Sequence, residues 1–297
     1  MSAPSVPDLL CPHCHEALHF TPASSADPGT APASLRCSKG HHFDAARQGY
    51  FNFLVGKGTV FEADSAPMVA ARYDFLASGH YDPLADAVAD AVAPALTAGS
   101  PLILDAGTGT GHYLRRVLDR FAPAAGLRAL AMDISKFAVR RAARLNPEAV
   151  NVVSDIWQPL PVADGTVDAI MVVFAPRNVA GFARALRPGG LLVVVTPRPG
   201  HLAEIAAATG MLGIEPGKEE RLATQMGTHF RTSHVQDLDV AMELGTAQVA
   251  DLAFMGPAGH HLDRAALAEK LAARTGSAGT TPVTAQFRIT TFVPLPA

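Results

Sequence analysis

Cysteine, tryptophan and long apolar runs are scarce in this chain of 297 residues, which has three cysteines and one tryptophan. An odd number of cysteines cannot all pair within one chain, which argues against a secreted disulfide scaffold and favours a reducing compartment. Apolar runs such as residues 190–196 are far shorter than the roughly 20 residues that a membrane-spanning helix needs. Residues 1–10 lack the features of a signal peptide. We therefore expect a cytoplasmic protein with no membrane partner.

The chain also lacks an excess of positive charge. Its net charge is −3, which argues against a basic coat for unspecific binding to nucleic acid but allows a local basic patch. Hydrophobic residues make up 48% of the chain and charged residues 17%, a composition unlike that of disordered or fibrous proteins. The length fits one large domain with a small accessory unit.

Short apolar runs alternate with segments of helical periodicity in the middle of the chain. This alternation predicts β-α units around a parallel sheet that is buried on both faces, and a last alternating segment is expected to close the sheet. Residues 1–60, which contain every cysteine, are predicted to form a separate metal-binding domain, and residues 61–297 the α/β domain. The predicted strands lie at residues 102–107, 127–133, 150–155, 167–176, 191–197 and 283–295.

The cysteines indicate a metal site. Cys11 and Cys14 have the two-residue spacing that lets one turn present both sulfurs to a tetrahedral ion, and Cys37 and His41 can supply two further ligands. Four protein ligands leave no position for water, so we predict a structural zinc. The alternative is three unliganded thiols, but a unit this small and rich in loops needs a staple. Other histidines compete with His41 for the fourth position: His42 and, less strongly, His13 and His15.

Three alternating glycines follow the first predicted strand, in the sequence Asp105-Ala-Gly107-Thr-Gly109-Thr-Gly111. Glycines allow positive φ and let a ligand approach the backbone, and the following helix offers free N–H groups at its N-terminus. The dinucleotide fingerprint is G-x-G-x-x-G, whereas G-x-G-x-G is the spacing of S-adenosylmethionine-dependent methyltransferases. We therefore expect S-adenosylmethionine as the cofactor.

Two acidic residues continue this pattern at the ends of the next strands. Asp133 ends the second strand, where a carboxylate can accept both ribose hydroxyls, and Asp155 follows the third, within expected reach of the adenine amino group. Either one alone is more often a loop or helix cap. In register with the glycines, they predict a Rossmann-like class I methyltransferase with a seven-stranded, mostly parallel sheet.

The fourth predicted strand ends at Phe174-Ala175-Pro176-Arg177-Asn178. Ligands bind at the carboxyl ends of parallel strands, so this loop is expected to face the donor methyl group. It is similar to the acid-Pro-Pro-aromatic loop of enzymes that methylate exocyclic amino groups, but the acid is absent, which favours chemistry on a ring nitrogen. Pro176 could instead merely end the strand. The candidate catalytic residues are therefore Ala175, Pro176 and Arg177.

Further motifs lie in a fixed order from residue 11 to residue 202. They are Cys11-Pro-His-Cys14, Cys37-x-x-x-His41-His-Phe-Asp44, Gly49-Tyr-Phe-Asn-Phe-Leu54, Phe75-Leu-x-x-Gly-His-Tyr81, the glycine turn, Phe174-Ala-Pro176 and Thr196-Pro-x-x-x-His201-Leu202. In this order they resemble the bacterial 23S rRNA (guanine-N1) methyltransferases, the family that contains the tylosin-resistance methyltransferase.

The resemblance implies a zinc-bearing N-terminal domain that recognises RNA, a Rossmann-like methyltransferase domain and a homodimer. Its zinc ligands fall on Cys11, Cys14, Cys37 and His41, and its donor contacts on Tyr81, Tyr113, Leu114 and His201. Tyr81 could instead be a core aromatic, and His201 a histidine that supports the fold. Residues 255–261 are more similar to the branch that modifies one guanine of an rRNA hairpin loop and confers resistance to macrolides of the tylosin type.

A guanine acceptor sets the chemistry that is needed. Its N1 proton must be removed, or the deprotonated ring stabilised, before in-line attack on the sulfonium methyl. We expect residues 175–177 to dock the flipped base, with Arg177 or Asn178 hydrogen-bonding its edge. Basic residues of the metal domain can meet phosphates or be ordinary surface charge: Arg36, Lys39, Arg47 and Lys57.

Two other functions fit parts of the sequence. One is a methyltransferase for a quinone or natural product, whose zinc unit is an interaction adaptor; the aromatic run at residues 49–54 argues against it, because such a run suits stacking on unpaired bases. The other is an RNA-binding protein without catalysis, which the intact glycine turn with both Asp133 and Asp155 disfavours.

Overall fold

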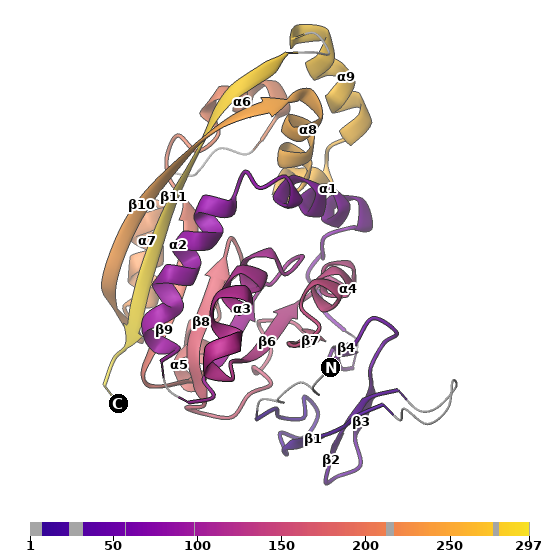
Figure 1. Cartoon of the computed structure of the whole chain (residues 1–297), viewed down its shortest axis with the longest axis vertical. Helices are drawn as coiled ribbons and strands as arrows, with labels where there is room; N and C mark the ends of the chain where they lie inside the picture. Colours follow the sequence, from indigo (N-terminus) through magenta and orange to yellow (C-terminus); the bar gives the residue numbers. More distant parts are fainter. Residues whose placement is uncertain are drawn as a thin grey trace.

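The structure is a computed structural model that describes residues 8–23, 32–56, 58–97, 99–211, 217–275 and 279–296. Its centre is a sheet of eight strands within these ranges, in the order β10-β11-β9-β8-β5-β6-β7-β4 (Figure 1). The strands are β4 (Tyr50–Asn52), β5 (Leu102–Ala106), β6 (Arg128–Asp133), β7 (Val150–Val153), β8 (Val167–Val173), β9 (Leu186–Pro197), β10 (Phe230–Gly245) and β11 (Thr280–Pro294). The pairs from β4 to β9 are parallel, whereas β11 runs antiparallel to both β9 and β10.

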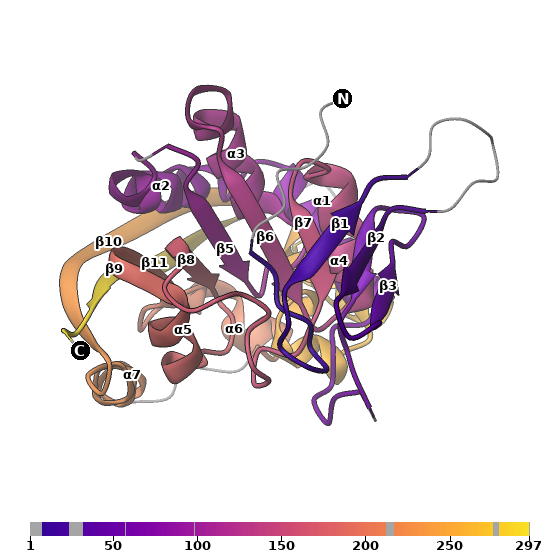
Figure 2. The same ribbon diagram turned by 90° about the horizontal axis from the view of Figure 1, so that it is seen from below.

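The central strands are the apolar runs of the sequence. Every residue of β5, β7 and β8 is buried, because helices cover both faces of the sheet. Figure 2 shows α2 and α3 on one face and α5 and α7 on the other. The helices are α1 (Ala66–Ala77), α2 (Asp82–Val92), α3 (His112–Ala125), α4 (Lys136–Leu145), α5 (Val179–Ala185), α6 (Ala203–Thr209), α7 (Lys218–Met226), α8 (Thr246–Phe254) and α9 (Arg264–Thr275), with the 3-10 turns η1 (Ala93–Ala95) and η2 (Pro257–His260).

The metal-binding segment forms a ribbon at one side of the molecule. Strands β1 (Leu18–Thr21), β2 (Ser34–Cys37) and β3 (His42–Asp44) make a three-stranded antiparallel sheet. The chain then enters the main sheet as β4, parallel to β7. We expected seven strands; β4 is an eighth at the edge, formed by the aromatic run that follows the ribbon. The division of the chain at residue 60 stays a prediction.

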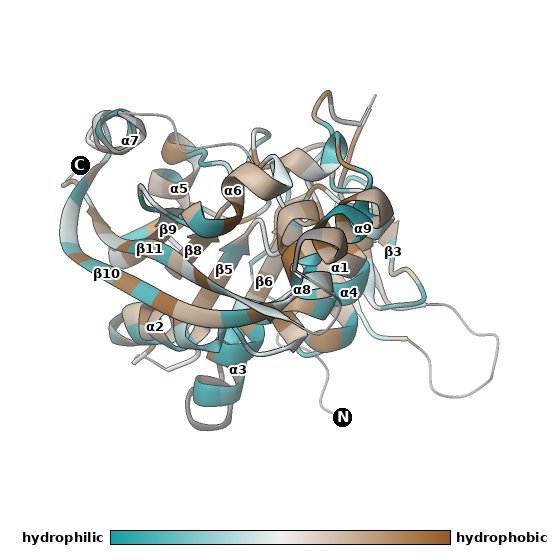
Figure 3. Cartoon of the chain, turned by 90° about the horizontal axis from the view of Figure 1, so that it is seen from above, coloured by the Kyte–Doolittle hydropathy of each residue, from teal (hydrophilic) through white to brown (hydrophobic). Residues whose placement is uncertain are grey.

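The far side of the sheet is a long hairpin of β10 and β11, paired from Phe230–Pro294 to Gly245–Thr280 with one irregularity between Thr232 and His234. Its β11 strand confirms that the last alternating segment is a strand of the sheet, but β11 does not close the sheet: it lies between β9 and β10, and β10 forms the edge. Hydropathy changes repeatedly along β10, part of which lies against solvent (Figure 3). Among the helices of the described residues, none is long and apolar enough to cross a membrane.

Candidate functional site

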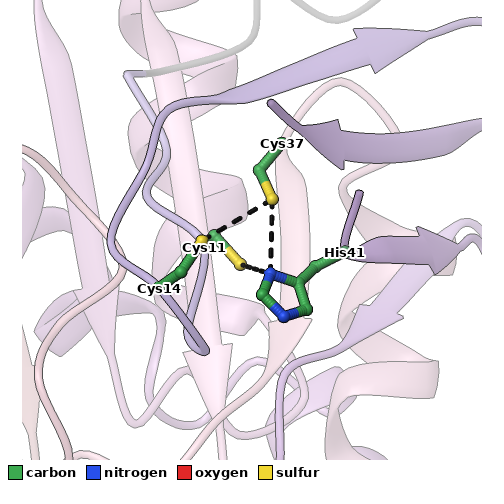
Figure 4. A group of neighbouring side chains, drawn as sticks. All are labelled: Cys11, Cys14, Cys37 and His41. Atoms are coloured by element: carbon green, nitrogen blue, oxygen red, sulfur yellow. Dashed lines mark hydrogen bonds between the residues drawn. The ribbon is translucent and has the colours of Figure 1, made fainter. Parts of the chain in front are cut away.

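Four side chains of the ribbon converge on one point (Figure 4). Cys14 Sγ lies 3.6 Å from Cys37 Sγ, and His41 Nδ1 lies 3.5 Å from Cys11 Sγ and 3.4 Å from Cys37 Sγ. All four ligand atoms are within 4.8 Å of one another. A tetrahedron with metal–sulfur distances of about 2.3 Å has edges of about 3.8 Å, so the four atoms fit a zinc ion with little movement. We call these residues the metal cluster.

Tight turns build the metal cluster. The amide of His15 donates to the carbonyl of Cys11 (2.8 Å) and the amide of Cys37 to the carbonyl of His41 (3.1 Å), which folds each pair around its own turn. The second turn passes through Gly40, whose φ of +86° favours glycine. The competing histidines lie elsewhere: His42 pairs with Asp44 (3.1 Å), and the His13 ring stacks on His41.

The electrostatics of the metal cluster suit a cation. Burial raises the pKa of Cys37, but hydrogen bonds from the backbone and ring of His41 outweigh it and bring that pKa to about 6. At neutral pH this sulfur is therefore largely a thiolate, the form that binds metal. Burial raises the pKa of Cys11, whose proton an arriving ion displaces.

The glycine turn, residues 107–111, connects β5 to α3 at the carboxyl edge of the sheet. The amides of Gly107 and Thr108 donate to the carbonyl of Met132 (2.8 and 2.9 Å), and the Gly109 amide donates to Asp133 Oδ2 (2.9 Å). The first hydrogen bond of α3 runs from the Arg115 amide to the Gly111 carbonyl, so the helix gives no partner to the amides of residues 112–114. These amides can meet a ligand.

Two of the three glycines are required by close packing. A Cβ at residue 107 would lie 2.3 Å from Ala175 Cβ, and one at residue 111 would lie 2.4 Å from Asn146 Nδ2. Gly109 has no atom nearer than 3.7 Å to such a Cβ. The outer glycines therefore hold the turn against its neighbours, while the middle one leaves room above the backbone.

Both predicted acidic residues lie at the same edge as the glycine turn. Asp133 Oδ1 accepts from the Ser135 amide (2.8 Å) while its Oδ2 accepts from Gly109. Asp155 is buried, with Oδ1 accepting from the Trp157 amide (3.0 Å) and Oδ2 from the Thr59 hydroxyl (2.9 Å). Each is a loop cap in this structure, and its role towards a nucleoside stays a prediction.

Asp105 is the most perturbed carboxyl at this edge. It is buried at the end of β5, where its Oδ2 accepts from the Thr108 hydroxyl (2.6 Å). Burial raises its pKa to about 7; the bond from Thr108 lowers that pKa, and the charge of Asp133 adds to the rise. Asp105 therefore exchanges a proton near neutral pH and can gain from a cationic ligand.

Three of the four donor contacts implied by the resemblance meet in a cluster of rings. Phe287 of β11 contacts the rings of Tyr81 (5.1 Å between centroids), His201 (5.0 Å) and Phe174 (5.6 Å), and Phe174 contacts Tyr113 (6.5 Å). We call these five residues the aromatic cluster.

The surroundings of these residues limit what each can contact. Tyr81 and Tyr113 are nearly buried, which raises the pKa of both phenols. His201 bonds the backbone of Gln286 through Nδ1 (3.0 Å), and burial lowers its pKa, so it supports the fold as a neutral ring. Leu114 has its whole side chain in the core, so only its backbone can reach a ligand.

The acceptor loop, residues 174–178, links β8 to α5 beside the glycine turn. Phe174 has φ of +55°, a conformation that costs a residue with a side chain roughly 1–2 kcal/mol. Its ring is still 45% exposed. Such strain is concentrated at functional sites. Here it accompanies an exposed aromatic side chain at the solvent side of the aromatic cluster.

Arg177 is a partly buried cation with few partners. Its Nη1 donates to the Ala175 carbonyl (3.5 Å), and its Nε is buried with no hydrogen-bond partner among the described residues. Burial lowers the pKa of the guanidinium. Asn178, the other predicted base contact, is already engaged: its Nδ2 donates to the Ile156 carbonyl (2.8 Å) and its Oδ1 caps α5 by accepting from the Gly181 amide (3.0 Å). Arg177 is thus the side chain left to bind a ligand.

Known proteins are similar to both the ribbon and the methyltransferase part of this chain. Residues 9–55 match the N-terminal zinc ribbon of the RlmA family, and residues 103–190 match a methyltransferase domain. A Streptomyces fradiae protein, named 23S rRNA (guanine(748)-N(1))-methyltransferase, is 44% identical over 90% of this chain and 91% of its own. A Micromonospora griseorubida protein named for 23S rRNA (guanine-N(1)-)-methyltransferase activity is 41% identical over 98% of both chains.

This chain is a 23S rRNA (guanine-N1) methyltransferase by family. A malonyl-[acyl-carrier protein] O-methyltransferase of Xylella fastidiosa is also similar, at 38% identity, but over only 36% of this chain and 38% of its own. The family assignment brings S-adenosylmethionine and zinc as cofactors, in agreement with the glycine turn and the metal cluster.

In this methyltransferase, a segment that sequence reasoning missed crosses the carboxyl edge. Residues 59–64, which we call the strap, are tied down at both ends. Thr59 bonds Asp155, and the carbonyl of Asp64 accepts from the Ser135 hydroxyl (2.8 Å) while its carboxylate pairs with Arg72. His260 of η2 reaches Glu62 (3.2 Å). The strap carries no motif, and only its long-range partners reveal it.

Proposed function

We propose that this chain transfers a methyl group from S-adenosylmethionine to N1 of a guanine in a hairpin loop of 23S rRNA. The observation that carries this proposal is full-length similarity: relatives named for this reaction align over the ribbon and the methyltransferase domain alike. A methyltransferase for small molecules needs only the second part.

The carboxyl edge would hold the donor. When bound, S-adenosylmethionine supplies a methyl group activated by a sulfonium. In this proposal Asp133 accepts hydrogen bonds from the ribose hydroxyls and Asp155 from the adenine amino group, while Gly109 adds no side chain above the turn and Asp105 offers a buried carboxyl group. Amides of Tyr113 and Leu114, together with Tyr81 and His201, complete the predicted donor contacts.

The acceptor loop would hold the base. Phe174 offers an exposed ring on which a flipped guanine can stack, beside Ala175 and Pro176. Arg177 can donate to guanine O6, where negative charge gathers as N1 gives up its proton to solvent. A guanidinium that is partly buried strengthens that interaction, and its hydrogen bond to the Ala175 carbonyl (3.5 Å) is long and weak enough to be given up.

We also propose that the metal cluster binds one structural zinc and so fixes the ribbon against the catalytic domain. Elemental analysis of the purified protein is expected to find one zinc per chain. Absence of stoichiometric zinc would contradict this assignment.

The central test is incubation of the protein with labelled S-adenosylmethionine and unmodified 23S rRNA, followed by nucleoside analysis and mapping by reverse transcription. We expect 1-methylguanosine at one hairpin position. Reverse transcription locates it, because a methyl on N1 blocks base pairing and stops the copying. Transfer to a quinone or natural product, with none to rRNA, would favour the small-molecule function instead.

Finer features extend the same proposal. We propose methylation at guanine 748, the position in the name of the Streptomyces fradiae relative. We further propose resistance to macrolides of the tylosin type, a homodimer and a cytoplasmic location. Drug susceptibility of a host expressing the gene, and the mass of the protein in solution, test the first two of these additions.

A further inference from the structure

One face of α4 carries a row of positive side chains. Lys136, Arg140 and Arg144 are spaced four residues apart and all are exposed. A helix rises 1.5 Å per residue, so the three positions follow one another about 6 Å apart along the axis. Lys136 also lies over the Phe137 ring (5.3 Å).

The ribbon adds a fourth cation to this row. Arg47 lies in the tight turn that the Gly49 amide closes on the Ala46 carbonyl (2.8 Å), just before β4. This turn and the end of α4 enclose an open cavity of about 460 Å³. Its walls are Arg47, Gln48, Arg140, Ala143, Arg144 and Pro147. We call Arg47, Lys136, Arg140 and Arg144 the basic track.

The basic track lacks the counter-charges that most arginines of this chain have. Within the described residues, no carboxylate pairs with any of its four members. The acids nearest in sequence are engaged elsewhere: Asp133 accepts from the Ser135 amide (2.8 Å), Asp44 pairs with His42 (3.1 Å) and Glu148 pairs with Arg115 (2.6 Å). Carboxylates pair with many other arginines: Arg72, Arg115, Arg116, Arg120, Arg128, Arg184, Arg187, Arg198, Arg264 and Arg288. In a chain of net charge −3, four unpaired cations in a row are therefore a local feature.

The track joins the two functional ends of the molecule. Helix α4 begins at Ser135, which bonds both Asp133 and the strap, and its other end lies beside β4 and the ribbon (Figure 1). Lys136 is therefore next to the carboxyl edge, and Arg47 and Arg144 are next to the ribbon. A ligand that follows the track would run between the carboxyl edge of the sheet and the segment that joins the ribbon to β4.

We propose that the basic track binds the ribose-phosphate backbone of the rRNA substrate and guides it from the ribbon to the acceptor loop. This inference rests on the proposed function and adds the path of the rRNA across the protein surface. Regularly spaced cations along an open groove match a chain of phosphates, whereas they contribute nothing to recognition of one base. Of the predicted ribbon contacts, Arg47 belongs to the track, Arg36 is exposed, Lys39 pairs with Glu16 (3.2 Å), and Lys57 lies outside the described residues.

The test compares the wild type with the double variant Arg140→Gln/Arg144→Gln, using a 23S rRNA hairpin as substrate at several salt concentrations. The slope of log affinity against log salt is negative, and each lost phosphate contact makes it shallower by about 0.7 to 0.9. The ratio of the rRNA affinity of the wild type to that of the double variant is therefore expected to fall roughly tenfold between about 50 and about 200 mM salt. The Kd of S-adenosylmethionine is expected to stay unchanged.

A matched control is Arg231→Gln on β10, an exposed arginine at the opposite end of the sheet. Its salt slope is expected to equal that of the wild type. If the double variant keeps the wild-type slope, the track is wrong, even where the variant is less stable because Arg144 has left the C-terminal turn of α4. If the wild type methylates no rRNA, the proposed function itself fails.

Discussion

In the glycine turn, three backbone amides and both carboxylates beside them are hydrogen-bonded, and two glycines are packed within a few ångströms of neighbouring side chains. The acceptor loop next to it is the reverse: Phe174 is strained and exposed, and Arg177 has a buried nitrogen without a partner. The backbone of the turn is therefore fixed by the protein itself, while the amides of residues 112–114 and the groups of the loop remain for ligands. This difference supports our proposal that the turn holds the donor and the loop holds the base.

The substitution Gly107→Ala is expected to have the largest effect, because residue 107 of the turn packs directly against Ala175 of the acceptor loop. Its Cβ would collide with Ala175, and φ of +84° disfavours alanine, so both the turn and the acceptor loop would move. A misplacement of about 1 Å costs about a hundredfold in rate, and both reactants are displaced here, so we expect a loss on the order of a thousandfold. Donor titration and methyl transfer measure the effect; Gly109→Ala, whose Cβ would only reach ordinary contact distance from Arg72 (3.7 Å) although its φ of +54° is also unfavourable for alanine, is the milder comparison.

Arg177→Gln tests the loop alone. We expect kcat for rRNA methylation to fall about a hundredfold, the usual cost of removing one donor that stabilises developing negative charge. Arg177→Lys should recover part of it, since the charge returns without the planar fork. Equal kcat in wild type and Arg177→Gln would remove Arg177 from the mechanism.

Phe174→Ala removes the stacking surface. Stacking of a base on an aromatic ring contributes about 1–3 kcal/mol, so the KM for rRNA is expected to rise roughly thirtyfold. Phe174→Tyr should preserve it. Phe174→Gly should relieve the positive φ and leave unfolding no easier than in Phe174→Ala, while the KM for rRNA stays raised; if Phe174→Gly keeps the KM of the wild type, the ring has no role in binding.

Asp105→Asn has the smallest expected effect on methyl transfer and tests the electrostatics of the glycine turn. The folded-state pKa of about 7 lies above the unfolded value, so the folded chain holds a proton that the unfolded chain has released. Stability from this group is therefore lost as pH rises from about 4 to about 7. Relative to wild type, Asp105→Asn should gain a few °C in Tm between pH 5 and pH 8. An unchanged difference across this range would show that Asp105 does not titrate there.

Local spacing was enough to predict the most regular parts of the molecule. The apolar runs gave the parallel strands, and the Cys-x-x-Cys and Cys-x-x-x-His spacings named four side chains that the structure brings together. Features made by distant segments could not be predicted. β10 alternates too weakly to stand out, and β4 was read as part of a separate domain. Phe287 contacts Phe174, and the strap is held to Ser135 and Asp155, through partners more than 70 residues away.

The division between turn and loop is tested most directly by titrating S-adenosylmethionine into the wild type, Phe174→Ala and Arg177→Gln by calorimetry, with single-turnover methylation of an rRNA hairpin measured on the same samples. The account predicts donor affinities within about twofold of wild type for both loop variants, while their transfer rates fall. Donor affinity that falls in proportion to the transfer rate would contradict it, because the loop would then belong to the donor site.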